Sequence, residues 1–477
     1  MADHIDATLT KAQAAGAHPA ELAALRRRLD QLAEPQAGQL PSSALEPLDD
    51  LPRLEDLPEP SAEQARDVLD RLAVVKLNGG LGTSMGLSGP KSLLEVKPGH
   101  SFLDILATQV LALRERYAAR LPLLLMNSPT TRGPSVDVLR RHAGLAHAGL
   151  AEAGLVEAGL AEAGLAEAGD GLPPDFLQGR EPKLRESDLM PVEWPPDPEL
   201  EWCPPGHGDL YTALAASGTL DALLAAGLRW CFVSNSDNLG ALADVRLAAW
   251  ISAEGLPFAM EVVRGTAADR KGGHLARHQG RTVLRETAQV PEGDQSFTDV
   301  ERWRYYNTNN LWIDLRALQA LQAADPGAPV LPLIVNRKTV DPTDPSSTPV
   351  IQLETAMGAA IGSIEGARAV QVPRTRFAPV KTTDDLLVVR SDAYELNADG
   401  RLAPTFDGPS PVVTLDRDRF RLLPDFERRF PAGPPSLRRC RRLQVEGDVT
   451  FGVDVVVEGD VRITGPRHVA DGEVLRG

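Results

Sequence analysis

Short apolar runs that end in polar residues recur along the chain from residue 72 onward. LAVVKL at 72–77, PLLLMNS at 122–128 and WCFVSNSDN at 230–238 are each about the length of one strand. Continuous apolar runs of this length are typical of strands buried on both faces. Helical spacing appears between them, as in SFLDILATQVLALRERY at 101–117. The alternation predicts an α/β fold with a parallel sheet and crossover helices, whose ligands bind beyond the carboxyl ends of the strands.

The chain divides into three parts by its patterning. Residues 1–70 hold leucines at helical spacing between 22 and 32, then a proline-rich stretch, which predicts an N-terminal helical segment and a linker. The strand and helix pattern predicts a catalytic domain over 71–392. A C-terminal domain is expected over 393–477, because the period of the sequence changes there.

A low-complexity insertion interrupts the catalytic part at 143–169. The pentad Ala-Gly-Leu-Ala-Glu recurs there almost unchanged. A pentapeptide solenoid would need several stacked coils to bury its own face, and this stretch is too short to supply them. An alanine-rich insertion, partly helical and weakened by a glycine in each unit, is the better interpretation, and we assign it no chemistry.

Four consecutive hexads follow near the C-terminus: LQVEGD, VTFGVD, VVVEGD and VRITGP, from 443 to 466. A hexad period with glycines at the corners favours a short parallel β-helix. An antiparallel meander is the alternative, because the apolar residues also alternate at period two. Eight apolar positions are in phase: Leu443, Val449, Val455, Val461, Val445, Phe451, Val457 and Ile463.

Composition excludes several classes of protein. The 477 residues are too many for one ordinary core, and a net charge of −16 argues against general nucleic-acid binding. The three cysteines lack metal-ligand spacing, which fits a reducing compartment. No apolar run approaches the ~20 residues that span a bilayer, so we expect a soluble, cytoplasmic protein without a membrane partner.

The glycine-rich string VKLNGGLGTSMGLSGPKS at 75–92 is the strongest chemical signal. Glycines let backbone N–H groups approach an anion, and Lys91 adds a positive charge, so a phosphate is expected there. The dinucleotide fingerprint fails because Gly80, Gly82 and Gly86 are spaced one residue too far apart. The P-loop fails because Pro90 precedes the lysine. Spacing alone leaves a merely structural turn open.

The complete string resembles the glycine loop of the eukaryotic-type UDP-glucose pyrophosphorylases, with Leu87 in place of the usual cysteine. The similarity continues in order through PPGHGDLY, FVSNSDNLGA, DRKGGHL, ETAQVP, NTNNLWIDL, IQLETAMGAAI and VPRTRFAPVKTTDDLL, and it covers roughly residues 72–465. It implies a Rossmann-like, GT-A-like nucleotidyltransferase fold. That fold has a mixed sheet with helices on both faces and a short C-terminal left-handed parallel β-helix.

The same resemblance implies a reaction. UTP and α-D-glucose 1-phosphate would be the substrates, the sugar phosphate would attack the α-phosphorus of UTP, and UDP-glucose and pyrophosphate would be the products. Because both substrates are anions, the step needs neutralisation by a metal and lysines rather than acid–base work. Lys91, Lys381 and Asp237 are the implied catalytic residues, and Asp237 would hold Mg²⁺.

Further contacts follow from the resemblance residue by residue. The nucleotide would be bound by Leu77, Asn78, Gly79, Gly80, Met126, Gln178 and Gly206. The sugar and its phosphate would be bound by His207, Asn235, Glu286, Asn307, Asn309 and Asn310. We expect His207 to donate a hydrogen bond to phosphate rather than to act as a base. Met126 equally suits a hydrophobic core, and Lys271 is either a loop contact or without function.

Two other functions stay open from the sequence. A related pyrophosphorylase with another or a broader sugar 1-phosphate is one, although Ser84 stands where those relatives usually carry arginine. A non-catalytic sugar-nucleotide scaffold is the other, although Lys91, Asp237 and Lys381 are all present. Self-association through the C-terminal β-helix is a further expectation.

Overall fold

The computed structural model describes residues 2–34, 38–146, 172–266, 269–270 and 272–477. Its helices are α1 Ala2–Ala14, α2 Pro19–Leu32, α3 Ala62–Asp70, α4 Phe102–Tyr117, α5 Pro129–Arg141, α6 Ala143–Ala146, α7 Leu210–Ala216, α8 Thr219–Ala225, α9 Val245–Glu254, α10 Leu315–Ala324, α11 Thr383–Arg390, α12 Arg417–Phe420 and α13 Leu423–Arg429. Its strands are β1 Leu72–Asn78, β2 Glu95–Lys97, β3 His100–Ser101, β4 Leu123–Asn127, β5 Asp175–Leu177, β6 Glu181–Pro182, β7 Leu184–Arg185, β8 Trp202–Cys203, β9 Trp230–Asn235, β10 Phe258–Arg264, β11 His274–His278, β12 Arg281–Arg285, β13 Tyr305–Asp314, β14 Leu333–Thr339, β15 Pro349–Thr355, β16 Arg368–Gln371, β17 Tyr394–Leu396, β18 Leu402–Pro404, β19 Val412–Thr414, β20 Ser436–Glu446, β21 Val449–Phe451, β22 Val456–Thr464, β23 Arg467–Val469 and β24 Val474–Arg476.

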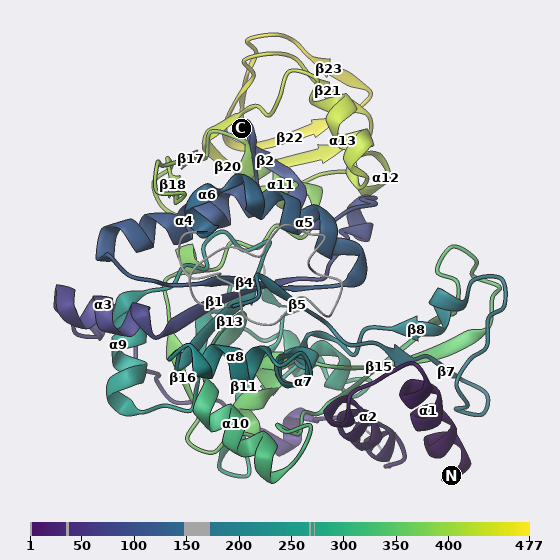
Figure 1. Cartoon of the computed structure of the whole chain (residues 1–477). Coiled ribbons are helices and arrows are strands. Elements are labelled where there is room, and N and C mark those ends of the chain that lie inside the picture. Colours follow the sequence, from purple (N-terminus) through teal and green to yellow (C-terminus); the bar gives the residue numbers. More distant parts are fainter. Residues whose placement is uncertain (1, 35–37, 147–171, 267–268, 271) are drawn as a thin grey trace.

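A mixed sheet lies at the centre of the molecule and contains nine strands of the described chain (Figure 1). Strands β5, β4, β1 and β9 are parallel neighbours in that order. Strand β13 pairs antiparallel with β9, and β10, β11, β12 and β16 extend the sheet beyond it. The predicted parallel sheet is therefore correct for the half that carries the polar strand ends. The reversed direction of β13 makes the whole sheet mixed.

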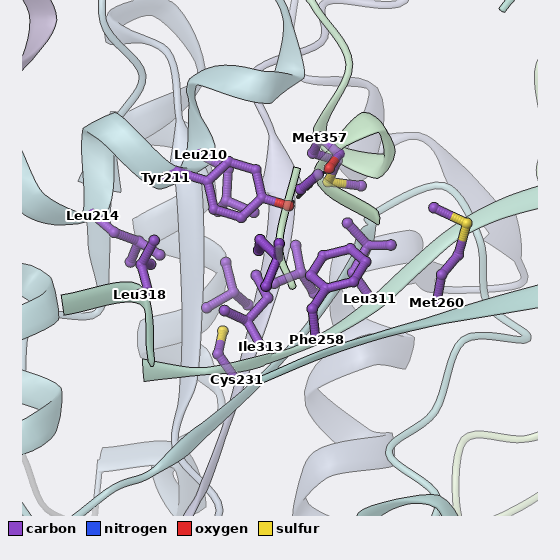
Figure 2. Close-up of a cluster of buried hydrophobic side chains, with 14 of the residues drawn as sticks. Leu210, Tyr211, Leu214, Cys231, Phe258, Met260, Leu311, Ile313, Leu318 and Met357 are labelled. Carbon is purple, nitrogen blue, oxygen red and sulfur yellow. Dashed lines mark hydrogen bonds between the residues drawn. The ribbon is translucent and has the colours of Figure 1, made fainter. Parts of the chain in front are cut away.

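Helices cover both faces of this sheet because alternate residues of its strands face two separate cores. In β1, Val75 packs into one cluster of buried side chains and Val74 into another. The first cluster includes residues of α7, α8 and α10, and Tyr211 within it donates from its hydroxyl to the carbonyl of Met357 at 2.7 Å (Figure 2). The second includes residues of α3, α4, α5 and α9. The prediction of helices on both faces is confirmed.

Helices α1 and α2 lie at the opposite end of the molecule from the C-terminal strands (Figure 1). The leucines that predicted a helix are in α2, and Leu25 and Leu29 are buried against Leu184 and Leu353 of the small sheet β14-β15-β7. The predicted N-terminal helical segment is therefore present, and it packs directly onto the rest of the chain through a hydrophobic cluster of its own.

The C-terminal strands form parallel ladders. Leu443 of β20 pairs with Val461 of β22, and Val449 of β21 pairs in register with Arg467 of β23, so each residue meets the one three hexads further along. All eight in-phase apolar positions of the hexads are buried. Parallel pairing excludes the antiparallel meander for these strands, because a meander would reverse the direction of each successive strand.

The same C-terminal core reaches the glycine-rich loop. Met85 of that loop is buried in one cluster with Phe420 and with residues of the C-terminal ladders. A Cβ atom on Gly86 would lie 3.0 Å from a methyl carbon of Leu422. The predicted domain boundaries at 70 and 392 stay predictions.

The pentad insertion falls largely outside the described residues. Only its first residues appear, in α6, which ends at Ala146. The helices that the structure describes include none that is both long and apolar enough to cross a bilayer.

Candidate functional site

The carboxyl ends of four parallel strands bring the predicted nucleotide contacts together. Leu77, near the end of β1, pairs with Met126 of β4 on one side and with Asn235 of β9 on the other. Gln178 follows β5 directly, and its backbone N–H donates to the carbonyl of Asn127 at 2.8 Å. The polar strand ends therefore form one continuous edge, as the sequence pattern predicts.

Two of the predicted base contacts have buried side chains. The Asn78 amide donates to Asn127 Oδ1 and to Ser135 Oγ, both at 2.7 Å, and only 2% of its surface is exposed. Met126 is equally buried and belongs to the main core. The Asn78 side chain thus fixes the start of the glycine-rich loop. Because the side chains of Asn78 and Met126 are buried, a contact with the nucleotide base would have to be made by their backbone atoms.

Gln178 joins two loops that the sequence separates widely. Its Nε2 donates to the carbonyl of Gly206 at 2.8 Å, and its Oε1 lies 2.9 Å from the place where a Cβ on Gly79 would stand. Glycine at 79 is therefore needed for close approach. At Gly206 the positive φ of 79° and the nearby carbonyl of Thr355 leave no room for a side chain. The predicted contacts Gly79, Gly206 and Gln178 are neighbours.

Lys91 and Asp237 form an ion pair at this edge. The lysine Nζ lies 2.6 Å from Asp237 Oδ2, and both side chains are about 15% exposed. The glycine-rich loop between β1 and Lys91 turns back on itself, because the backbone N–H of Lys91 donates to the carbonyl of Gly80 at 3.1 Å. A Cβ on Gly80 would meet nothing within 4 Å, so the loop surface there is open to a ligand.

The second oxygen of Asp237 is the clearest sign of a missing partner. Asp237 Oδ1 is buried and has no hydrogen-bond donor among the described residues. A buried carboxylate oxygen without a partner is costly, and a cation would satisfy it. The described residues contain no group of three or more metal-ligating side chains. This donor set fits Mg²⁺, which takes one or two carboxylates and completes its shell with water and phosphate oxygens.

His207 is set in a fixed tautomer. Its Nδ1 accepts from the backbone N–H of Met357 at 3.1 Å, so the proton of the neutral ring is on Nε2. Burial, together with the charge of Lys381, lowers the pKa of His207 to about 4. The ring is therefore neutral near pH 7 and has one N–H to donate. This arrangement fits the predicted hydrogen-bond donor and does not suit a base that works near pH 7.

Lys381 reaches the site from a different segment. Its segment is bonded to the loop that carries Asp237, since the backbone N–H of Val380 donates to the carbonyl of Asp237 and Asn238 forms a β-bridge with Pro379. The Lys381 side chain is exposed. Burial lowers the pKa of His207 and raises the pKa of Glu286, and the charge of Lys381 adds to the first shift and opposes the second. These effects place the ammonium near the predicted sugar and phosphate contacts.

The predicted sugar contacts on β13, and Glu286 after β12, divide into two groups. Asn307 donates to Asn309 Oδ1 at 2.8 Å and hydrogen-bonds Glu286, whose pKa is raised by burial. Asn307 Nδ2 also lies 3.0 Å from where a Cβ on Gly358 would stand, one residue from the partner of His207. Glu286, Asn307 and Asn309 are therefore gathered on the side of the sheet that His207 approaches.

Asn310 is not with them. Its amide donates to Glu261 Oε2 at 3.0 Å and to the carbonyl of Arg376 at 3.3 Å, and its Oδ1 accepts from Asn238. The residue is fully buried. A register shift opposite Glu261, with a positive φ of 57° at Asn309, turns Asn310 away from its neighbours. Its polar atoms are occupied in the interior, so its predicted sugar contact has no support here.

Sequence reasoning missed the residues that hold the site in place. Met357 supports His207 from 150 positions away, and Asn127 and Ser135 support Asn78. A polar residue at the end of β4 was the only available signal for Asn127. Lys271 lies outside the described residues.

The H207Q variant should lose less unfolding free energy than the wild type when the pH is lowered. The folded pKa of about 4 lies below the ordinary value of about 6.5, so the neutral ring contributes stability above pH 6.5 that is lost as the pH falls toward 4. Urea unfolding at pH 7 and at pH 4.5 measures the change. The drop in unfolding free energy between these two pH values should be smaller in H207Q than in the wild type. Equal drops would contradict a buried, neutral His207.

Comparisons with known proteins agree with this geometry. Residues 25–149 and 174–458 match the family model described as UTP–glucose-1-phosphate uridylyltransferase. The enzymes of that name from Musa acuminata and Saccharomyces cerevisiae are 38% and 39% identical, over 88% and 83% of this chain and 84% and 74% of their own.

Solved structures are similar over nearly the whole chain. A mutant UDP-glucose pyrophosphorylase from Leishmania major, in complex with UDP-glucose, has a TM-score of 0.89 at 39% identity and covers 100% of this chain and 98% of its own. The protein from Trypanosoma brucei has a TM-score of 0.85 at 41% identity, with 99% and 98% covered. Sequence, fold and strand-edge geometry thus agree, and the chain belongs to the UTP–glucose-1-phosphate uridylyltransferase family.

Proposed function

We propose that the protein transfers uridylyl from UTP to α-D-glucose 1-phosphate and releases pyrophosphate. Its family and its named relatives support this reaction. The observation that carries it in this chain is the Lys91–Asp237 pair at the carboxyl edge of the sheet, with one buried carboxylate oxygen left without a partner. A lysine, a carboxylate and an anion-accepting loop are what two phosphorylated substrates require.

The first task of the site is to overcome repulsion between the substrates. The glycine-rich loop offers backbone N–H groups to the triphosphate, and Lys91 offers a point charge. Lys381 comes from a separate segment that is bonded to the Asp237 loop, and its charge acts on His207 and Glu286, where a sugar phosphate would enter. Held between the two lysines, the attacking oxygen and the α-phosphorus approach in line at little further electrostatic cost.

Mg²⁺ is the proposed cofactor, and Asp237 is its proposed protein ligand. Bound there, Mg²⁺ would supply charge neutralisation at the phosphate oxygens. The residues of the chain do the remaining work. Asp237 orients Lys91 through their ion pair, and His207 donates from Nε2 to a phosphate oxygen. Glu286, Asn307 and Asn309 accept from and donate to the sugar hydroxyls.

Base recognition is proposed at the edge formed by β1, β4 and β5. Gln178 has its amide directed between Gly79 and Gly206, and the open surface of Gly80 lies beside it. A flat base fits against a backbone without side chains, and the amide and backbone groups would read its polar edge. The proposal assigns the base to the backbone of 77–80 and to Gln178.

The C-terminal ladders are proposed to be a short left-handed parallel β-helix that mediates self-association. The three-hexad offset between paired strands supports a coil, and β19 and β24 are open edges with the exposed Val412 and Val474. Sedimentation measurements test the second part. Val474→Lys should shift a concentration-dependent assembly toward smaller species, and the absence of assembly at all concentrations would contradict it.

A cytoplasmic location is proposed as well. Cys203, Cys231 and Cys440 are free and buried in the structure. Free thiols of this kind fit a reducing compartment.

The central test is the formation of product. With Mg²⁺, UTP and glucose 1-phosphate, the purified protein should release pyrophosphate and form UDP-glucose. Lys381→Ala should lower kcat by at least about a hundredfold, because one preorganised charge at a developing anion contributes a factor of this size. Lys338→Ala is the matched control, since Lys338 is exposed and binds only Gln352 in the described chain.

Two outcomes of that test would contradict different parts of the proposal. Pyrophosphate at background level with intact UTP binding would overturn the proposed reaction. Equal turnover in Lys381→Ala and the wild type would overturn only the role of Lys381. Replacing glucose 1-phosphate with other sugar 1-phosphates in the same assay separates the broader-specificity alternative.

Asp237→Asn should impair the use of metal while keeping the shape of the side chain. The loss of charge removes both the partner of Lys91 and the proposed Mg²⁺ ligand, so kcat should fall by about 10²–10³ and half-maximal activity should need more Mg²⁺. Calorimetric titration of UTP with and without Mg²⁺ gives a second readout, because the metal should strengthen UTP binding less in D237N. Asp221→Asn, at an exposed carboxylate bound to Gln319, is the control. An unchanged Mg²⁺ dependence in D237N would contradict the metal assignment.

A further inference from the structure

A buried carboxylate lies behind the proposed base-recognition segment. Asp209 is only 3% exposed, and its Oδ2 accepts from the backbone N–H of Gly179 at 2.6 Å. Gly179 directly follows Gln178, so this hydrogen bond fixes the peptide next to the amide side chain that is proposed to read the base.

Two hydrogen bonds clamp the same pair of segments. The Gln178 side chain donates to the carbonyl of Gly206, and Asp209, three residues after Gly206, accepts from Gly179. The turn that carries Asp209 is closed by its own backbone N–H, which donates to Gly206 at 3.2 Å. Gln178 is therefore held from both its side chain and its following peptide, which restricts where its amide can point.

Helix α2 closes the other side of the segment. A Cβ on Gly179 would lie 2.8 Å from Glu21 Oε1 and 3.1 Å from Asp209 Oδ2, so Gly179 fits between two carboxylates. Two residues later, Glu181 accepts from Arg28 Nε and Nη2 at 3.0 and 2.6 Å. Helix α2 thus packs against the segment from Gly179 to Glu181.

The charge of Asp209 costs the folded protein stability. Burial raises its pKa to about 6, the hydrogen bond from Gly179 and the charge of Arg28 oppose that rise, and Glu21 adds to it. Asparagine could accept the same hydrogen bond without a buried charge. A residue kept at a cost to the fold is expected where it serves function, because strained or destabilising groups persist at functional sites.

We propose that Asp209 is a positioning residue for nucleotide recognition, which holds the Gly179 amide and thereby sets the direction of the Gln178 side chain toward the base. This inference rests on the proposed function, because the contact of Gln178 with the base belongs to that proposal. Asp209 touches no substrate. Its effect should appear in the affinity for UTP and hardly in the chemical step.

Steady-state kinetics on Asp209→Ala and Asp209→Asn test the proposal. Asp209→Ala should raise KM for UTP about tenfold and change kcat by less than about threefold, because the clamp acts on binding. Asp209→Asn should recover most of the affinity, since its amide oxygen still accepts from Gly179. Asp314→Ala is the matched control. Asp314 is 5% exposed and caps α10 by accepting backbone N–H groups, so its loss should lower stability and leave KM for UTP unchanged.

The outcomes separate this inference from the proposed function. An Asp209→Ala protein with lowered thermal stability and unchanged KM for UTP would overturn the positioning role. A wild type that forms no UDP-glucose would overturn the proposed function, and calorimetric UTP affinities of the same variants would still decide the role of Asp209. If Asp209→Ala does not fold, Gly179→Ala carries the test. Its added methyl group should displace the segment and raise KM for UTP with Asp209 intact, and an unchanged KM would overturn the proposal.

Discussion

The ion pair between Lys91 and Asp237 is the interaction on which the proposed site depends. The protein carries 16 more negative than positive charges, so the bulk of its surface repels the two anions it is proposed to join. Positive charge must therefore be concentrated where the phosphates meet. At 2.6 Å the pair holds the lysine in a defined place, and the second, buried oxygen of Asp237 has no hydrogen-bond partner among the described residues. The same carboxylate thus orients the Lys91 ammonium through one oxygen, and its other oxygen is proposed to bind Mg²⁺.

The positions of these groups follow from the sheet. Parallel strands end together, so the residues that follow β1, β4, β5 and β9 meet without any long-range matching of loops. Lys381 and His207 come from segments outside this edge, and hydrogen bonds to backbone carbonyls attach those segments to it. The backbone N–H of Val380 donates to the carbonyl of Asp237, and the Gln178 amide donates to the carbonyl of Gly206, next to His207. Rigid strands place one half of the site, and a few specific bonds place the other.

Much of this arrangement was predictable, and the exceptions have physical causes. The apolar runs predicted the parallel strands and their crossover helices, because that signal is local in sequence, and the resemblance of the complete glycine-rich string implied helices on both faces and a nucleotide-binding loop. The burial of Asn310 was not predictable, since a single register shift opposite Glu261 decides which asparagines of β13 face the site. The docking of α2 includes an ion pair between Arg28 and Glu181, 153 residues apart, beside its hydrophobic cluster. No pattern in the sequence connects them.

The shared core of Met85, Phe420 and the C-terminal ladders gives the tail a part in forming the anion loop. With Leu422 against Gly86, the wall of the loop is contributed by residues more than 300 positions downstream. Exchanging the tail with that of a relative would therefore be no neutral swap of modules. In a hybrid protein, the residues that pack against Met85 and Gly86 would differ, and the loop would no longer fit against them. The loop residues would have to be exchanged together with the C-terminal residues.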